Sequence, residues 1–211
     1  MYKQIIKRIF DLLLSGVAIL LLAIPMLVIA LAIKIDDPGP VFFKQRRVGM
    51  KKNGEITYFM MLKFRSMRVD APRDIPTHLF ENPEQYITRV GRFIRRASLD
   101  ELPQIYQVFT GKLSLVGPRP ALWSQDDLVA EREKYGANEM KPGITGWAQI
   151  NGRDELAIAE KARLDGEYTA AMNAGKGFLM DLRCLFGTVS CVLKADGFIE
   201  GTGTQEEENH D

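Results

Sequence analysis

The apolar residues of this chain begin as one long uncharged run and then break into short segments of changing period. The run from Leu12 to Ile33 has no charged residue and is long enough to cross a bilayer, which needs about 20 residues. No small-residue cleavage site follows it, so the run is not a secretory signal. It also has no polar face, which disfavours a buried helix of a soluble protein. We therefore expect a helix embedded in a membrane.

Two features of this segment argue against a simple crossing. Pro25 lies near its middle, where proline removes a backbone hydrogen bond and kinks a helix. Basic residues flank both ends, and the positive-inside rule places such flanks on the cytoplasmic side. A re-entrant helix, bent at Pro25 and confined to one face, satisfies both flanks, and a spanning helix that tolerates its proline is the alternative. The flanking residues are Lys3, Lys7 and Arg8 before the run, and Lys34, Lys44, Arg46, Arg47, Lys51 and Lys52 after it.

After the breaker sequence Asp37-Pro38-Gly39-Pro40, the pattern predicts a helix-rich α/β domain with a small β-hairpin. Two strands, 41–44 and 56–62, flank the hairpin-type turn Asn53-Gly54. The stripe at 178–193 fits either core packing or an amphipathic helix on the membrane. Further segments are a proline-containing surface loop at 69–86, helices at 87–97, 102–109, 128–135 and 155–173, and a short strand at 113–116.

The domain organisation follows from these elements. Residues 1–36 form the membrane-embedded re-entrant helix, 37–200 a cytoplasmic catalytic domain, and 201–211 an acidic tail that we expect to be disordered. The length of 211 residues and the hydrophobic share of 46% suffice for one domain with a core. The sequence does not decide whether the chain forms a homo-oligomer.

Charge and cysteine content exclude several functional classes. The net charge of +1 provides no global field suited to nucleic acid. Cys184 and Cys191 would lie roughly 10 Å apart on a helix, too far for a disulfide, which fits a reducing cytosolic compartment. The two histidines, His78 and His210, have no Cys/His ligand spacing around them, which argues against a structural zinc site.

The adjacent carboxylates Asp100 and Glu101 are the first candidates for chemistry. They follow an arginine-rich stretch, and acids among arginines suit the handling of phosphate. Asp100 could be the N-cap of the next helix, which would place Pro103 where its missing N–H costs nothing. A carboxylate can equally attack phosphorus to give a covalent aspartyl intermediate, while its neighbour binds Mg²⁺ or manages a proton. The fragment alone leaves both interpretations open.

Basic residues and glycines nearby give weaker signals. Arg92, Arg95 and Arg96 share one helix, which fits a solvated face or contacts to lipid headgroups as well as a binding role. Arg119 lies between two prolines that hold its backbone extended, which suits a planar phosphate clamp. The glycine-rich stretch 142–153 fits either close approach to a ligand or ordinary turns. Asp165 is a further acid that fits a metal shell, a helix cap or a surface position.

Together these segments resemble the bacterial sugar transferases, the monotopic polyprenol-phosphate phosphoglycosyl transferases. The matching segments occur in the same order as in the family, from about residue 7 to about residue 183. Each segment alone is a modest signal, but together they are specific for the family. The resemblance departs at Gln107, where the family often has Asn, and at Lys112, where it often has an acid. The matching segments are Lys7 to Asp11, Asp37 to Phe43 with Gln45, Arg47 and Gly49, Lys63 to Met67, Thr88 to Arg92, Ser98 to Gln104, Leu115 to Pro120, and Pro142 to Arg153.

The resemblance implies a minimal enzyme at the cytoplasmic face of the inner membrane that requires Mg²⁺. Such enzymes move a sugar 1-phosphate from a UDP-sugar to undecaprenyl phosphate and release UMP, an early step of glycan assembly. By the family pattern Asp100 is the nucleophile and a Mg²⁺ ligand, and Glu101 is its partner and a second candidate ligand. Arg119 contacts the nucleotide donor, and Lys63, Arg95 and Asp165 match further substrate-binding positions.

Two rival functions fit the same residues. A membrane-bound, Mg²⁺-dependent hydrolase of nucleotide sugars would use the same acids and arginines but would need no lipid acceptor. A non-catalytic membrane scaffold would use Asp100 only as a helix cap. Dependence of UMP release on the polyprenol phosphate separates the first rival, and an Asp100→Asn variant separates the second.

Overall fold

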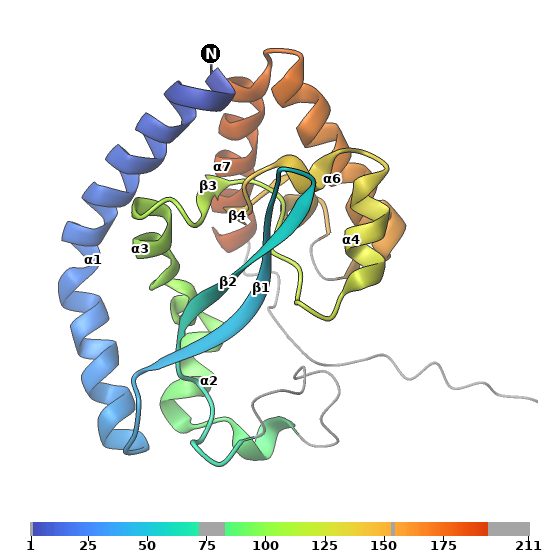
Figure 1. Ribbon diagram of the computed structural model, residues 1–211. Helices are drawn as coiled ribbons and strands as arrows, with labels where there is room; N and C mark the ends of the chain where they lie inside the picture. The colour runs from blue at the N-terminus through green and yellow to red at the C-terminus, as the bar shows by residue number, and fades with distance from the viewer. Residues whose placement is uncertain (1, 72–82, 153–154, 194–211) are drawn as a thin grey trace, which may run out of the picture.

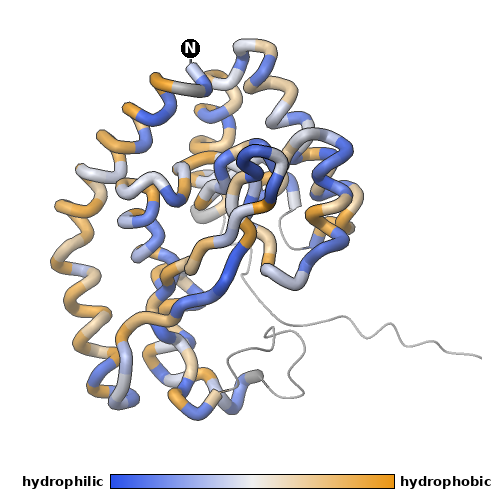
Figure 2. Tube along the Cα trace, in the orientation of Figure 1, coloured by the Kyte–Doolittle hydropathy of each residue, from blue (hydrophilic) through white to orange (hydrophobic). Residues whose placement is uncertain are grey.

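Helix α1 (Lys7–Asp36) dominates one side of the computed structural model, which describes residues 2–71, 83–152 and 155–193. It follows a short π-helical turn, η1 (Tyr2–Ile6), and stays a continuous α-helix through Pro25. Figure 1 shows α1 bowed along the body of the protein, and Figure 2 shows that it is hydrophobic over most of its length with hydrophilic residues near its ends. By length and composition α1 could cross a membrane. The expected N-terminal apolar helix is thus confirmed.

A twisted antiparallel hairpin crosses the centre of the molecule beside α1. Strands β1 (Phe42–Lys52) and β2 (Glu55–Phe64) pair from Phe42 with Phe64 to Lys52 with Glu55, as the sequence predicted, although both strands are longer than expected. The turn residues Asn53 and Gly54 both have positive φ angles, of 51° and 85°. This conformation suits a tight hairpin and explains the Asn-Gly pair.

Short helices connect the hairpin to the rest of the domain. Helix α2 (Arg89–Arg96) is capped by the Thr88 side chain and ends before Ser98, which has a left-handed backbone (φ 54°). The 3-10 turn η4 (Leu99–Glu101) and helix α3 (Gln104–Phe109) follow. The described part of the chain also contains η3 (Pro83–Tyr86), β3 (Ser114–Val116), α4 (Asp126–Glu133), η5 (Ala137–Glu139), β4 (Gly143–Thr145), α5 (Trp147–Ile150), α6 (Ile158–Asn173) and α7 (Gly177–Leu193).

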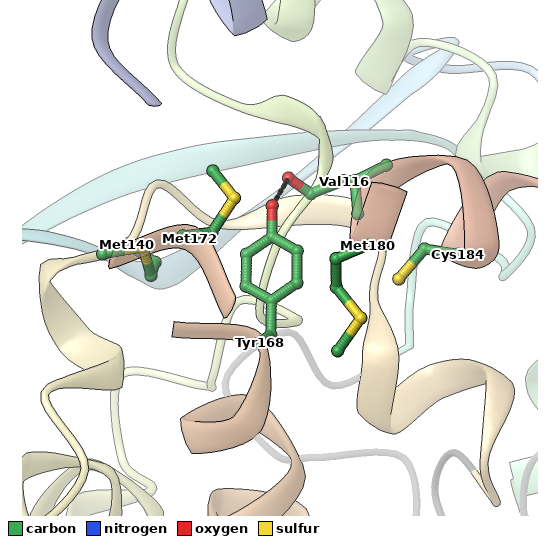
Figure 3. Close-up of a cluster of buried hydrophobic side chains, with 6 residues drawn as sticks. All are labelled: Val116, Met140, Tyr168, Met172, Met180 and Cys184. Carbon is green, nitrogen blue, oxygen red and sulfur yellow. Dashed lines mark hydrogen bonds between the residues drawn. The ribbon is translucent and has the colours of Figure 1, made fainter. Parts of the chain in front are cut away.

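The main core lies where α6 and α7 pack against the parallel pair of β3 and β4. Tyr168 is buried at its centre, and its hydroxyl donates to the carbonyl oxygen of Val116 at 3.2 Å (Figure 3). The buried side of α7 carries Met180, Asp181 and Cys184. The core-packing interpretation of the stripe at 178–193 is therefore wrong for three of its residues, Phe178, Phe186 and Val189, whose side chains are exposed.

Polar contacts join both ends of α1 to the rest of the folded chain. Near its start, Lys7 donates to Asp181 on α7 at 2.7 Å, and Arg8 donates to the carbonyl oxygen of Val108 at the end of α3. At its end, the Asp36 carboxylate accepts from the backbone N–H of Val90 at 2.9 Å. The basic residues before the apolar run thus dock the helix on the folded domain.

A second group of contacts continues along α1 and β2. The buried Asp11 carboxylate accepts from the N–H of Leu115 at 2.9 Å and from the hydroxyl of Ser114. On α3, the Gln107 amide accepts from the N–H of Leu62 and donates to the carbonyl oxygen of Met60, so its side chain pairs with β2 as a strand would. This explains how the chain accommodates Gln at a position where Asn was expected.

The helix-rich α/β class with two small sheets agrees with the sequence analysis. The predicted domain limits are not tested by these contacts and stay a prediction. The acidic tail at 201–211 and much of the predicted surface loop at 69–86 lie outside the described residues.

Candidate active site

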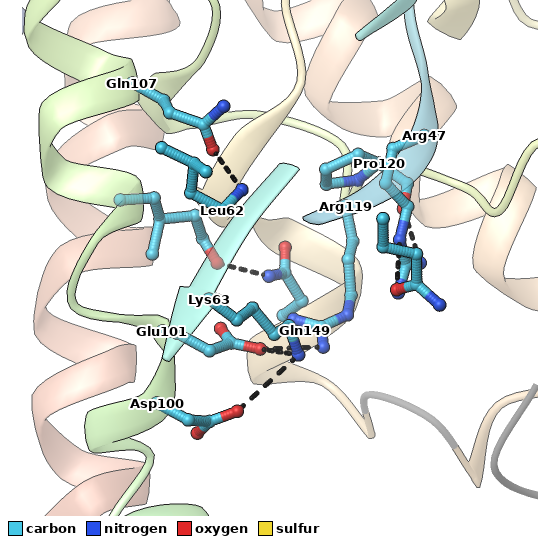
Figure 4. A network of polar contacts seen from close by, with 11 residues as sticks. Arg47, Leu62, Lys63, Asp100, Glu101, Gln107, Arg119, Pro120 and Gln149 are labelled. Carbon is cyan, nitrogen blue, oxygen red and sulfur yellow. Dashed lines mark hydrogen bonds and ion pairs between the residues drawn. The ribbon is translucent and has the colours of Figure 1, made fainter. Parts of the chain in front are cut away.

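Asp100 and Glu101 come together with two cations at one place in the fold. Asp100 is buried, with 6% of its surface exposed, and both acids belong to the η4 turn between α2 and α3. Lys63 reaches them from the end of β2, and Arg119 reaches them from the loop after β3 (Figure 4). Three segments far apart in the sequence thus converge here.

The Glu101 carboxylate is held by both cations. Its Oε1 accepts from Lys63 Nζ at 2.9 Å and from Arg119 Nη2 at 3.3 Å. Lys63 Nζ lies 3.8 Å from Asp100 Oδ2, so it bridges the two acids. Two negative and two positive groups therefore balance in a largely desolvated cluster, in which direct charge–charge interactions are stronger than in water.

The helix-cap interpretation of Asp100 is wrong. The N-cap position of α3 is occupied by Pro103, which makes no side-chain cap bond, and Asp100 lies inside the preceding 3-10 turn. The left-handed Ser98 makes no side-chain cap bond either, so the spacing of Ser98 and Glu101 does not produce a capping box. Asp100 is therefore not the N-cap residue of α3.

Two further polar groups near these elements are buried and lack a hydrogen-bond partner within the described part of the chain: Arg95 Nε and Gln104 Nε2. Gln104, the first residue of α3, is 2% exposed. Buried donors without partners are uncommon in native proteins. Both atoms are hydrogen-bond donors. Arg92, by contrast, is exposed and pairs with Glu84 at 3.7 Å.

Asp165 is the one predicted site residue that the structure pairs elsewhere. It is 1% exposed, and its Oδ2 accepts from Arg132 Nε at 2.8 Å and from Arg132 Nη2 at 2.6 Å. Burial raises the pKa of the Asp165 carboxyl, and the guanidinium of Arg132 acts in the opposite direction. Asp165 is thus bonded to Arg132, and its predicted role in substrate binding stays a prediction. No motif of the sequence singled out Arg132, which belongs to the helix predicted at 128–135.

Gly143 and Gly146 of the 142–153 stretch serve backbone packing. A side chain at Gly146 would place its Cβ 2.2 Å from the carbonyl oxygen of Gly117, and Gly117 itself donates its N–H to Thr145 at 2.8 Å. The Gly-Pro-Arg-Pro loop therefore lies directly on the glycine-rich segment. Close approach of two backbones is sufficient to explain Gly143 and Gly146. Arg153 and Asp154 lie outside the described residues.

The donor set suits a magnesium ion that is shared with a substrate. Mg²⁺ is usually bound through one or two carboxylates together with substrate phosphates. Asp100 and Glu101 supply two adjacent carboxylates, and no cluster of three or more His, Cys, Asp or Glu ligands occurs among the described residues. The two carboxylates fit such a shared ion, and Mg²⁺ at this site stays a prediction.

Comparison with known proteins identifies the family. A family model described as bacterial sugar transferase matches residues 2–195. The chain belongs to the bacterial sugar transferase family. All the predicted site residues, from Lys63 to Asp165, lie within the matched range.

Several curated relatives share this region. A UDP-glucose:undecaprenyl-phosphate glucose-1-phosphate transferase of Escherichia coli (strain K12) is 38% identical over 196 residues, covering 89% of this chain and 40% of the relative. An undecaprenyl-phosphate glucose phosphotransferase of Komagataeibacter xylinus is 41% identical over 193 residues, covering 87% and 35%. The chain therefore spans less than half the length of these two family members. The uncharacterized sugar transferase EpsL of Bacillus subtilis (strain 168) is 41% identical over 197 residues, covering 92% and 90%.

Proposed function

We propose that this chain is a phosphoglycosyl transferase that moves a sugar 1-phosphate from a UDP-sugar to undecaprenyl phosphate at a membrane surface. The observation that carries this proposal is the buried pair of Asp100 and Glu101, bridged by Lys63 and joined by Arg119. Family membership supports it, as do relatives named for transfer of glucose 1-phosphate to undecaprenyl phosphate. The two rival functions lack such relatives among the proteins described above.

The proposed reaction has two displacements at one phosphorus. First, an Asp100 carboxylate oxygen attacks the phosphorus that carries the sugar, the bond from this phosphorus to the bridging oxygen of the pyrophosphate breaks, and UMP leaves with that oxygen. Second, a phosphate oxygen of undecaprenyl phosphate attacks the same phosphorus. The bond to Asp100 then breaks, which restores the carboxylate and leaves the sugar on a lipid diphosphate. A covalent intermediate lets a soluble and a lipid substrate use one site in turn.

Each neighbouring residue has a distinct role in this scheme. Arg119 and Lys63 offset the charge of the donor pyrophosphate, and Arg95 supplies a further donor for phosphoryl oxygens. Glu101 holds Lys63 and Arg119 in place through its Oε1. Asp100 and Glu101 would hold Mg²⁺, which when bound neutralises negative charge on the pyrophosphate.

The packing of α1 supports insertion from one membrane face, the re-entrant form expected from the sequence. The helix is about 45 Å long, yet Lys7 at its start and Asp36 at its end bond to the same folded domain. If α1 spanned the bilayer, that domain and its charged side chains would have to lie within the hydrocarbon, which is costly. The middle of the helix presents apolar side chains outward, with Leu20 78% exposed. This favours a cytoplasmic-side protein that dips into the inner membrane.

The experiment is UMP release by the detergent-purified chain with Mg²⁺ and a panel of UDP-sugars, each with and without undecaprenyl phosphate. We expect continuous release with one or two donors, only when the lipid phosphate is present, and loss of release with EDTA. Equal steady release without the lipid would establish the hydrolase instead. Absence of release from every donor would contradict the proposed function.

A further inference from the structure

A buried ion pair outside the dyad (the pair of carboxylates Asp100 and Glu101) forms a hydrogen bond to the backbone of Arg119. Arg132 on α4 and Asp165 on α6 are 4% and 1% exposed, and two hydrogen bonds join them in a forked arrangement. The Nη2 of Arg132 also donates to the carbonyl oxygen of Arg119 at 3.0 Å. The pair therefore holds the residue whose side chain reaches Glu101.

Burial makes this pair an unusual choice for stability alone. A buried ion pair is costly to desolvate, and apolar residues of similar volume often stabilise a fold as well or better. The rest of the fold offers an exposed counterpart: Arg163 on α6 pairs with Glu160 at 2.6 Å and retains 46% of its side-chain exposure. The buried pair of Arg132 and Asp165, unlike the exposed pair of Arg163 and Glu160, also fixes a loop carbonyl, that of Arg119.

A second arginine holds the next carbonyl of the same loop. Arg47 on β1 donates from Nη1 to the carbonyl oxygen of Pro120 at 3.1 Å (Figure 4). Gln45 accepts from Arg47 Nη2 at 2.7 Å. The carbonyl groups of Arg119 and Pro120 are thus fixed from two different elements. With this backbone fixed, the guanidinium of Arg119 reaches Glu101 at 3.3 Å.

We infer that Arg132 and Asp165 are positioning residues, which set the backbone of Arg119 so that its guanidinium meets the sugar-nucleotide donor at the dyad. The inference rests on the proposed function. It assigns Asp165 an indirect role in place of direct substrate contact. A planar guanidinium is required, because only its fork bonds Asp165 through two nitrogens and also reaches the Arg119 carbonyl.

The kinetic scheme provides a readout that loss of fold cannot imitate. In a two-step displacement with a covalent intermediate, the kcat/KM for the donor depends on the first half-reaction, and the kcat/KM for the acceptor depends on the second. Misplacing a donor-binding arginine lowers the first value and leaves the second unchanged. A smaller fraction of folded protein lowers both values by the same factor.

The test compares Arg132→Lys with the wild-type chain and with the exposed control Arg163→Lys. Because small misplacements at a reacting centre can cost about 100-fold, we expect Arg132→Lys to lower kcat/KM for the UDP-sugar by about this factor. The kcat/KM for undecaprenyl phosphate and all values for the control should not change. In an Arg119→Lys background, the same substitution should have little further effect, because the two residues act as one unit.

Protection of the buried Cys184 thiol from a maleimide reports folding of the α6–α7 core in each variant. If Arg132→Lys loses this protection, Asp165→Asn takes its place, and loss in both would assign the pair to stability and overturn the inference. Equal losses for donor and acceptor, or no loss for either, would also overturn it. No turnover by the wild-type chain would refute the proposed function, and the inference with it.

Discussion

Replacing Asp100 with Asn removes the proposed nucleophile while keeping its shape. The carboxylate is buried, and its ion pair with Lys63 Nζ spans 3.8 Å. At an effective dielectric constant of about 20, charges at this separation attract by about 4 kcal/mol. The desolvation cost of the carboxylate, several kcal/mol, offsets most of this attraction. Lys63 also keeps Glu101 at 2.9 Å, so it retains a partner.

The expected effects on stability and on activity differ in size. The free energy of unfolding should change by less than about 2 kcal/mol, which corresponds to a melting-temperature shift of about 8 °C at most. Turnover should fall by about 10⁴-fold or more, as for removal of other covalent nucleophiles. That loss corresponds to about 5 kcal/mol of activation free energy. Lost stability therefore cannot account for the lost rate.

Purified Asp100→Asn is assayed for UMP release with the preferred donor and undecaprenyl phosphate, and its melting temperature is measured in parallel. Asp70→Asn is the matched control, because Asp70 is an exposed carboxylate paired with Arg68 at 3.1 Å. Its rate should equal that of the wild-type chain. Turnover of Asp100→Asn within tenfold of the wild-type rate would refute the reasoning, since an amide cannot form the proposed intermediate.

Two other predictions concern the whole chain. Burial, together with the nearby Asp181 carboxylate, raises the pKa of the Cys184 thiol to about 12, whereas Cys191 is exposed. A maleimide at pH 8 should therefore modify one thiol per native chain and two per denatured chain, and rapid modification of both in the native protein would contradict the packing of α7. For the membrane arrangement, Lys3→Cys and Lys52→Cys are made in a Cys191→Ser background. A membrane-impermeant maleimide should label both from the same side of sealed vesicles, and labelling from opposite sides would exclude the re-entrant form.

Local sequence signals predicted the elements on which the site is built. Asn53-Gly54 specifies its hairpin through the backbone preferences of these two residues, and the spacing of apolar residues predicted α3. The resemblance to the family predicted that Lys63, Asp100, Glu101 and Arg119 belong to one site, which no local pattern of the sequence indicates. Their geometry confirms that these four groups meet, while their chemical roles stay predictions.

Other features depend on packing that no local pattern encodes. Asp165 and Arg132 lie on different helices, so the choice of Arg132 as a partner follows only from how α4 packs on α6. The capping role of Asp100 failed because Ser98 turns left-handed and a 3-10 turn precedes α3. The period of the α7 stripe could not decide between its two interpretations, because apolar side chains of a membrane-bound helix have the same period as those of a core.

The covalent intermediate is the central claim, and the mass of the chain tests it most directly. The full chain is mixed with Mg²⁺ and the UDP-sugar that supports turnover, without undecaprenyl phosphate, and is then quenched, digested and mapped by mass spectrometry. The account predicts that about one UMP is released per chain and that the peptide containing Asp100 gains the mass of one sugar phosphate, which is lost when the lipid is added. An unmodified Asp100 in a chain that still turns over with the lipid would contradict the account.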